Sequence, residues 1–152
     1  MRMWNINPEL MCNKHLLGEH VEMHMFIGTI NKGVSIKGYL KKGLVEPHYI
    51  NKRHQDLVEE MEHRGMKHNS ELPKFLVVPK EKGYVDGEAN LLLISERCEE
   101  CKGRIISALH KEIEFARRTK NDTLRDLRRR DKQTEDNSNR LRSSSGVLYD
   151  TK

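Results

Sequence analysis

The segment that decides the fold of this chain runs Asn13-Lys14-His15-Leu16-Leu17-Gly18-Glu19-His20-Val21-Glu22-Met23-His24. With about 3.6 residues per turn, His15, Glu19 and Glu22 lie on one stripe of a helix. Apolar residues lie about a quarter-turn from this stripe and give the helix a face to bury: Leu16, Met23, Ile27 and Ile30. We therefore expect a first helix that begins at Pro8, ends near Asn31 and carries a polar stripe beside its buried face.

Proline, aspartate and glycine mark the ends of the later helices. Pro47 suits the first turn of a second helix, and Gly65 suits its end. Asp86 suits the N-cap of a third helix, which Gly103 ends or bends. Apolar spacing after Gly103 predicts a fourth helix that continues to about Arg118. The chain is thus expected to be all-α, with three to four helices.

The two ends of the chain differ from its helical middle. Residues 1–7 read as an extended segment with apolar side chains to bury, and residues 32–46 read as a glycine-containing loop. From Thr119 onward the apolar spacing stops, and charges, asparagine and serine dominate. We therefore expect a helical domain over residues 1–118 and a charged, flexible tail over residues 119–152.

Composition limits the classes of function without selecting one. Lys and Arg number 28 against 23 Asp and Glu, a formal net charge of +5, which is compatible with nucleic acid but supports DNA binding only weakly. No run approaches the roughly 18 apolar residues of a membrane span. Three cysteines, an odd number, and the lack of an apolar leader argue against a secreted disulfide scaffold. We expect a cytoplasmic protein with no membrane partner.

Two motifs invite a metal-binding interpretation, and we do not adopt it for either. His20 and His24 have i, i+4 spacing, but Val21 stands where the metalloprotease pattern has glutamate. We interpret them as surface histidines on a charged helix.

Cys98 and Cys101 have the CxxC spacing, but a structural zinc site needs two further ligands, and Cys12 is the one remaining cysteine. We expect this pair to close a helix without further function, and we expect no metal and no cofactor. A metal-binding regulator that uses these cysteines and the histidines remains a third alternative, which stoichiometric zinc in the purified protein would favour.

The segment from His15 to Glu22 resembles the HL-x-x-E-x-x-E signature of the pyrimidine-dimer DNA glycosylases of the phage endonuclease V type. The opening Met1-Arg2-Met3-Trp4-Asn5 is similar to that family's short N-terminal strand. The likeness continues through Lys52 to Gly65 and reaches to about residue 104. It implies a single-layer helical fold with the N-terminal segment threaded between the helices.

The resemblance also implies an activity, a DNA glycosylase with abasic-site lyase activity. In that family the chain's α-amine attacks C1′ of the damaged nucleotide, and a carboxylate supports the resulting imine and the elimination. Met1 and Glu22 match these two catalytic positions. Arg2 and His15 match positions that contact DNA near the lesion. We expect Lys14 and Glu19 to join them in the DNA-binding surface.

The amine chemistry agrees with general principles, because an α-amino group is less basic than a lysine side chain. Arg2 is a bulky second residue that normally blocks removal of the initiator, so we assign the amine to a retained Met1. Val21 and Met25 stand where the best-known members carry arginines, which weakens phosphate clamping. We expect a monomer acting on double-stranded DNA with dimers or abasic sites; the alternative is a non-catalytic, basic helical DNA-binding protein.

Overall fold

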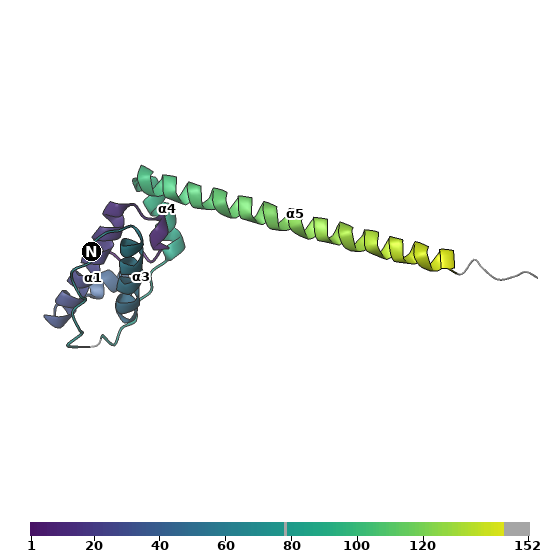
Figure 1. Cartoon of the computed structure of the whole chain (residues 1–152). Helices are drawn as coiled ribbons and strands as arrows, with labels where there is room; N and C mark the ends of the chain where they lie inside the picture. Colours follow the sequence, from purple (N-terminus) through teal and green to yellow (C-terminus); the bar gives the residue numbers. More distant parts are fainter. Residues whose placement is uncertain (78, 145–152) are drawn as a thin grey trace, which may run out of the picture. The chain divides into compact units, whose positions relative to one another are not determined.

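The computed structural model describes the backbone of residues 1–77 and 79–144, with side chains described as far as residue 137. Within these residues the structure is helical and contains no strand, which confirms the all-α prediction (Figure 1). The elements in chain order are η1 (Pro8–Leu10), α1 (Asn13–Asn31), α2 (Lys37–Lys41), η2 (Pro47–Tyr49), α3 (Ile50–His63), α4 (Gly87–Arg97) and α5 (Glu99–Ser144). None of these helices is both long and apolar enough to cross a membrane.

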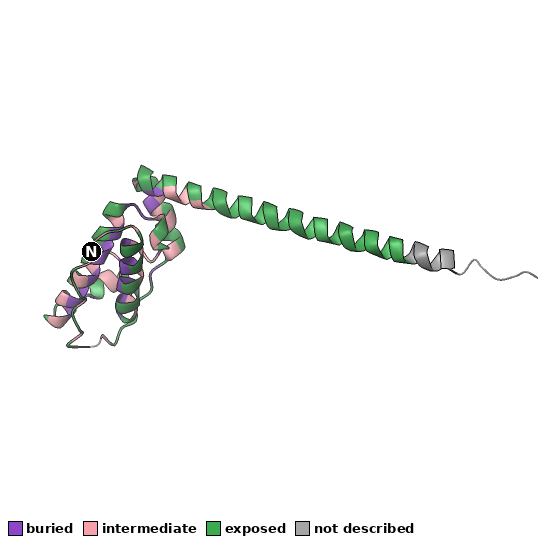
Figure 2. Cartoon of the chain, viewed as in Figure 1, coloured by how far each residue is buried: buried purple, intermediate pink, exposed green. Residues whose placement is uncertain are grey.

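The chain divides into two units, Met1–Ala108 and Leu109–Lys152. In the second unit every described side chain, from residue 109 to residue 137, is exposed (Figure 2). The prediction that the helix ends near Arg118 is wrong, because α5 continues to Ser144. Beyond Arg118, charged residues in i, i+3 ion pairs, such as Arg125 with Asp122, replace apolar spacing as its support. Residues 145–152 of the predicted tail lie outside the described residues. The division into a helical domain that ends at residue 118 and a tail that begins at residue 119 stays a prediction.

The core of the first unit is formed mainly by the facing sides of α1 and α3. The predicted apolar flank of the first helix is confirmed, since all four of its side chains are buried: Leu16, Met23, Ile27 and Ile30. On α3 the buried apolar side chains are Ile50, Leu57, Val58 and Met61. Each fully buried side chain of this size contributes roughly 1.5–3 kcal/mol. Helix α1 is therefore held firmly enough to position its polar stripe.

The N-terminal segment threads between these helices, as the resemblance predicted. Met3 is buried, and its backbone N–H donates to the carbonyl of Leu44 at 2.8 Å. Arg53 on α3 donates to the carbonyl of Ile6 at 2.7 Å. Asn90 on α4 donates to the carbonyl of Trp4 at 2.9 Å. The first six residues thus bond to α3, α4 and the loop before η2, which fixes the path of the chain's start.

Three predicted boundaries need correction. The first helix begins at Asn13 because Pro8 opens a separate 3-10 turn, after which the chain is extended at Met11. The third helix ends at Arg97 because Cys98 has an extended backbone (φ −140°, ψ 108°), and α5 begins directly after it. The loop predicted over residues 32–46 contains the short helix α2. The predicted end of the second helix is confirmed: α3 stops at His63, shortly before Gly65 with its φ of +71°.

Candidate active site

The α-amino group of Met1 lies beside the carboxylate of Glu22. Its nitrogen is 3.9 Å from Glu22 Oε1, and the backbone N–H of Arg2 donates to Oε2 at 2.9 Å. The Glu22 side chain is 30% exposed, so the pair is reachable from solvent. An amine and a carboxylate thus meet at a surface position, with the carboxylate oriented by the backbone one residue beyond the amine.

Glu19, one turn earlier on α1, holds the N-terminal segment in place. Its Oε1 accepts from the backbone N–H of Trp4 at 2.7 Å and from Arg53 Nε at 2.9 Å. Its Oε2 accepts from Arg53 Nη2 at 2.6 Å. Both charged side chains are buried. A buried carboxylate shared by α3 and the N-terminal backbone sets where the amine lies.

This arrangement corrects one expected role. We expected Glu19 on the DNA-binding surface, but its side chain is only 1% exposed and bonds within the protein. The spacing of Glu19 and Glu22 predicted that both lie on one stripe of the helix. It did not predict that Glu19 is buried whereas Glu22 is partly exposed. The buried position of Glu19 follows from Arg53, which comes from another helix.

The remaining predicted DNA contacts, Arg2, Lys14 and His15, are half-buried or exposed. Arg2 stacks over the Trp4 ring at 4.8 Å, and the rings of Trp4 and His15 meet edge to face at 5.6 Å. Lys14 is exposed at the start of α1. Trp4 thus links Arg2 and His15. From the sequence we expected the apolar side chains of residues 1–7 only to be buried.

Two positions on α1 also bear on DNA binding. Val21 and Met25 are exposed and four residues apart, so they lie on the same side of the helix. This chain therefore presents apolar surface at two positions where the best-known members of the family carry arginines.

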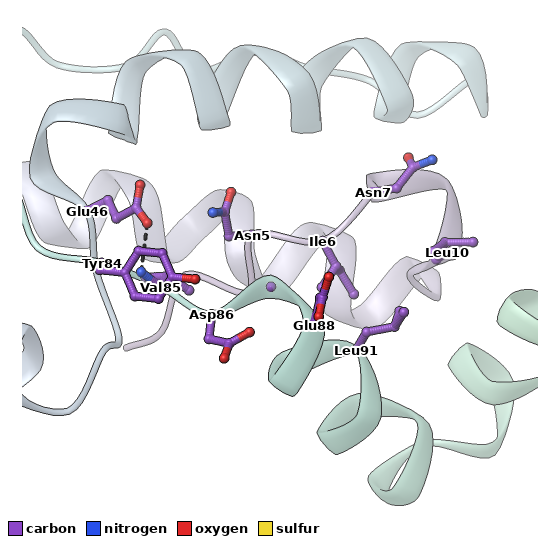
Figure 3. A pocket seen from close by; sticks show the side chains of 11 residues that line it. Asn5, Ile6, Asn7, Leu10, Glu46, Tyr84, Val85, Asp86, Glu88 and Leu91 are labelled. Atoms are coloured by element: carbon purple, nitrogen blue, oxygen red, sulfur yellow. Dashed lines mark hydrogen bonds between the residues drawn. The ribbon is translucent and has the colours of Figure 1, made fainter.

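A separate hollow of about 580 Å³ lies where the N-terminal segment meets the start of α4 (Figure 3). Asn5, Ile6 and Asn7 line one part of it, and Tyr84 and Asp86 line another. Glu46, also in its lining, accepts a hydrogen bond from the backbone N–H of Val85 at 2.7 Å. Met1 and Glu22 are not among its lining residues. The amine–carboxylate pair is therefore a surface feature distinct from this hollow.

Two side-chain clusters elsewhere in the first unit correct the interpretation of the metal-like motifs. Cys98 and Cys101 do not merely close a helix: Cys98 is the C-cap of α4, and Cys101 lies in the first turn of α5. Cys12 and His15 lie beside them, so that four side chains able to bind a metal have their ligand atoms within 4.8 Å of one another. Burial raises the pKa of the Cys101 thiol to about 12, whereas the backbone N–H of Cys101 lowers the pKa of Cys98.

The second cluster contains His20, which we expected on the surface. It is instead buried at 4% exposure, and it lies beside the buried His54 and the half-buried His24 and His68. Burial, with the neighbouring imidazoles, lowers the pKa of His20 and of His54 to about 4. His20 and His54 are therefore neutral near pH 7, the form in which imidazole binds metals.

Comparison with known families agrees with the resemblance. Residues 1–74 match the model of a family described as pyrimidine dimer DNA glycosylase. The matched part of the chain, which includes Met1, Glu22 and helices α1 to α3, is thus similar to the pyrimidine dimer DNA glycosylase family. The match ends at residue 74, short of the limit near residue 104 that we expected. No curated protein and no solved structure gives a significant match.

Proposed function

We propose that this chain is a DNA repair glycosylase that removes pyrimidine dimers and then cleaves the strand by abasic-site lyase chemistry. The observation that carries the proposal is the 3.9 Å separation between the Met1 nitrogen and Glu22. It lies inside the segment that matches the glycosylase family. The family gives damaged DNA as the substrate class.

The reaction begins when the α-amine of Met1, in its neutral form, attacks C1′ of the damaged nucleotide. The bond from C1′ to the base breaks, the base leaves with its electron pair and takes up a proton, and the sugar ring opens to a protonated imine. Glu22, as an anion, stabilises the cation that develops at C1′.

The same carboxylate then serves the lyase step. It takes a proton from C2′, and the electron pair of that C–H bond forms a double bond as the C3′–oxygen bond breaks. Water hydrolyses the remaining imine and restores the amine. Glu22 thus acts twice, which requires it to be near both the amine and the sugar.

DNA reaches this surface site by distortion of the duplex and extrusion of a nucleotide, which costs least where a dimer already weakens stacking. Arg2 and Lys14 supply phosphate contacts, which set position rather than sequence preference. His15 contributes beside Arg2.

The test is reductive trapping. Borohydride reduces a protonated imine to a stable amine, so the chain should become covalently fixed to DNA that carries an abasic site or a dimer. Acetylating the verified Met1 terminus, or extending it with a tag, should abolish trapping. Lys52→Ala, which removes an exposed side-chain amine outside the candidate site, should leave it intact.

Two outcomes decide against this proposal. Trapping by a chain with a fully blocked terminus would overturn the α-amine mechanism. Absence of trapping on abasic DNA, with a free and intact Met1, would favour the non-catalytic DNA-binding alternative.

A further inference from the structure

We propose that Cys12, His15, Cys98 and Cys101 together bind one structural zinc ion. The four ligands come from two segments far apart in the sequence. Cys12 is the N-cap of α1 and His15 lies in its first turn, whereas Cys98 and Cys101 flank the junction of α4 and α5. The proposal concerns folding and does not depend on the glycosylase chemistry.

The distances fit tetrahedral zinc. Zn–S bonds of about 2.3 Å and Zn–N bonds of about 2.0–2.1 Å place two sulfur ligands about 3.8 Å apart and a sulfur and a nitrogen about 3.5 Å apart. The sulfurs of Cys12 and Cys98 are 3.8 Å apart. His15 Nδ1 is 3.2 Å from the sulfur of Cys12 and 3.4 Å from that of Cys101. All four ligand atoms lie within 4.8 Å of one another.

The backbone around the sulfurs is arranged to support thiolates. The N–H of Cys12 donates to the sulfur of Cys101 at 3.2 Å, and the N–H of Cys101 donates to that of Cys98 at 3.5 Å. Backbone donors favour the charged form of an acceptor. On zinc binding the three thiols release their protons to solvent, and His15 binds as neutral imidazole.

The environment identifies the site as structural. Cys12 and Cys101 are buried, and four protein ligands leave no open position for a substrate. The ion would tie the start of α1, inside the family-matching segment, to residues beyond it. Because Nδ1 of His15 faces the cysteines, any DNA contact of this side chain is made through Nε2.

A second cluster carries an independent inference. We infer that His20, His24, His54 and His68 bind a divalent transition metal through four imidazole nitrogens. Neither ring nitrogen of His20 has a hydrogen-bond partner among the described residues, although both are buried. Buried polar atoms without partners are rare and costly, so a ligand that satisfies one of them is the direct explanation.

The geometry of this cluster agrees with that reading. His20 and His24 lie one turn apart on α1, His54 faces them from α3, and His68 comes from the chain after α3. Nε2 of His24 is 3.1 Å from Nε2 of His54, close to the roughly 3.3 Å between two nitrogens on tetrahedral zinc. The four ligand atoms again lie within 4.8 Å of one another. Imidazole ligands favour zinc, nickel or copper over magnesium or calcium.

The experiment is a metal count on the full chain, kept reduced, purified with zinc and weighed by native mass spectrometry. The wild type should hold two zinc ions. Cys98→Ser should lose the ion of the cysteine site and keep the other, and His68→Gln should do the reverse. His63→Gln, an exposed histidine outside both clusters, is the matched control and should keep two.

Cobalt substitution assigns each ion without relying on the stability of a variant. Wild-type protein and His68→Gln loaded with Co²⁺ should show sulfur-to-cobalt charge-transfer absorption, and Cys98→Ser should lack it. Loaded wild type without that absorption overturns the cysteine site. If the wild type holds a single ion and a mercurial reagent that binds the thiols releases that ion, the cysteine site is supported and the histidine site is overturned. Reduced wild type that binds no zinc overturns both. None of these measurements uses DNA, so they stand or fall separately from the trapping test.

Discussion

Glu19→Gln is the substitution that most sharply tests how the N-terminus is positioned. It keeps the size of the side chain and removes one charge from a buried pair. Arg53 then stays buried without its counter-charge, and one carboxylate oxygen becomes an amide nitrogen that cannot accept a hydrogen bond. The donors that lose a partner are on Arg53 or on the backbone of Trp4.

The magnitude follows from the burial of both partners. Breaking a buried ion pair by removing one member costs about 3–5 kcal/mol. For a unit near 100 residues, each 1 kcal/mol shifts the melting temperature by roughly 4–8 °C, so the expected loss is on the order of 12 °C or more.

The assay is thermal unfolding followed by far-UV circular dichroism, with reductive trapping measured well below the melting temperature. Glu114→Gln, which removes an exposed ion pair with Arg117, is the control and should melt like the wild type. Folded Glu19→Gln should also trap more slowly, because the Trp4 backbone no longer holds the amine beside Glu22. Unchanged melting and unchanged trapping would refute the role given to the buried pair.

Three further predictions concern catalysis, binding and packing. Glu22→Gln should melt like the wild type but cleave dimer-containing DNA about 10²–10⁴-fold more slowly, because an amide neither takes the C2′ proton nor offsets the cation. Cleavage at the wild-type rate would show that Glu22 has no catalytic role. Affinity for damaged DNA, measured by fluorescence anisotropy, should fall steeply with salt because the contacts are mainly to phosphate, and a salt-independent affinity would contradict the proposed surface. Gly87→Ala should lower the melting temperature and slow trapping, since its Cβ would lie 2.5 Å from the carbonyl oxygen of Asn5. Gly18→Ala, with no described atom within 4 Å, should instead raise stability by up to about 1 kcal/mol, and equal effects of the two changes would count against the packing argument.

Local patterns predicted the helices that make up the frame of the site. Apolar periodicity identified the buried faces of α1 and α3, and the resemblance placed Met1 and Glu22 in the positions where the structure brings them together. Periodicity failed beyond Arg118, where exposed ion pairs and helix propensity sustain α5 without an apolar face.

The features that escaped prediction depend on contacts between distant segments. Cys12 and Cys98 are 86 residues apart, and His24 and His54 are 30 residues apart, so no local spacing rule links them. The burial of Glu19 likewise depends on Arg53, on another helix. Each motif looked incomplete because its missing members join it only when the chain folds.

The break between η1 and α1 has a practical consequence for chemical synthesis. Native chemical ligation needs a cysteine at the start of the second fragment, and Cys12 supplies it directly after the extended Met11. A synthetic peptide thioester ending at Met11 can be joined to a recombinant chain that begins with Cys12, and the natural sequence is regenerated without a scar. Because the proposed nucleophile belongs to the main chain, no genetic substitution can alter it. Semisynthesis can instead install an isotopically labelled, methylated or absent amine at Met1, with Cys12 unchanged.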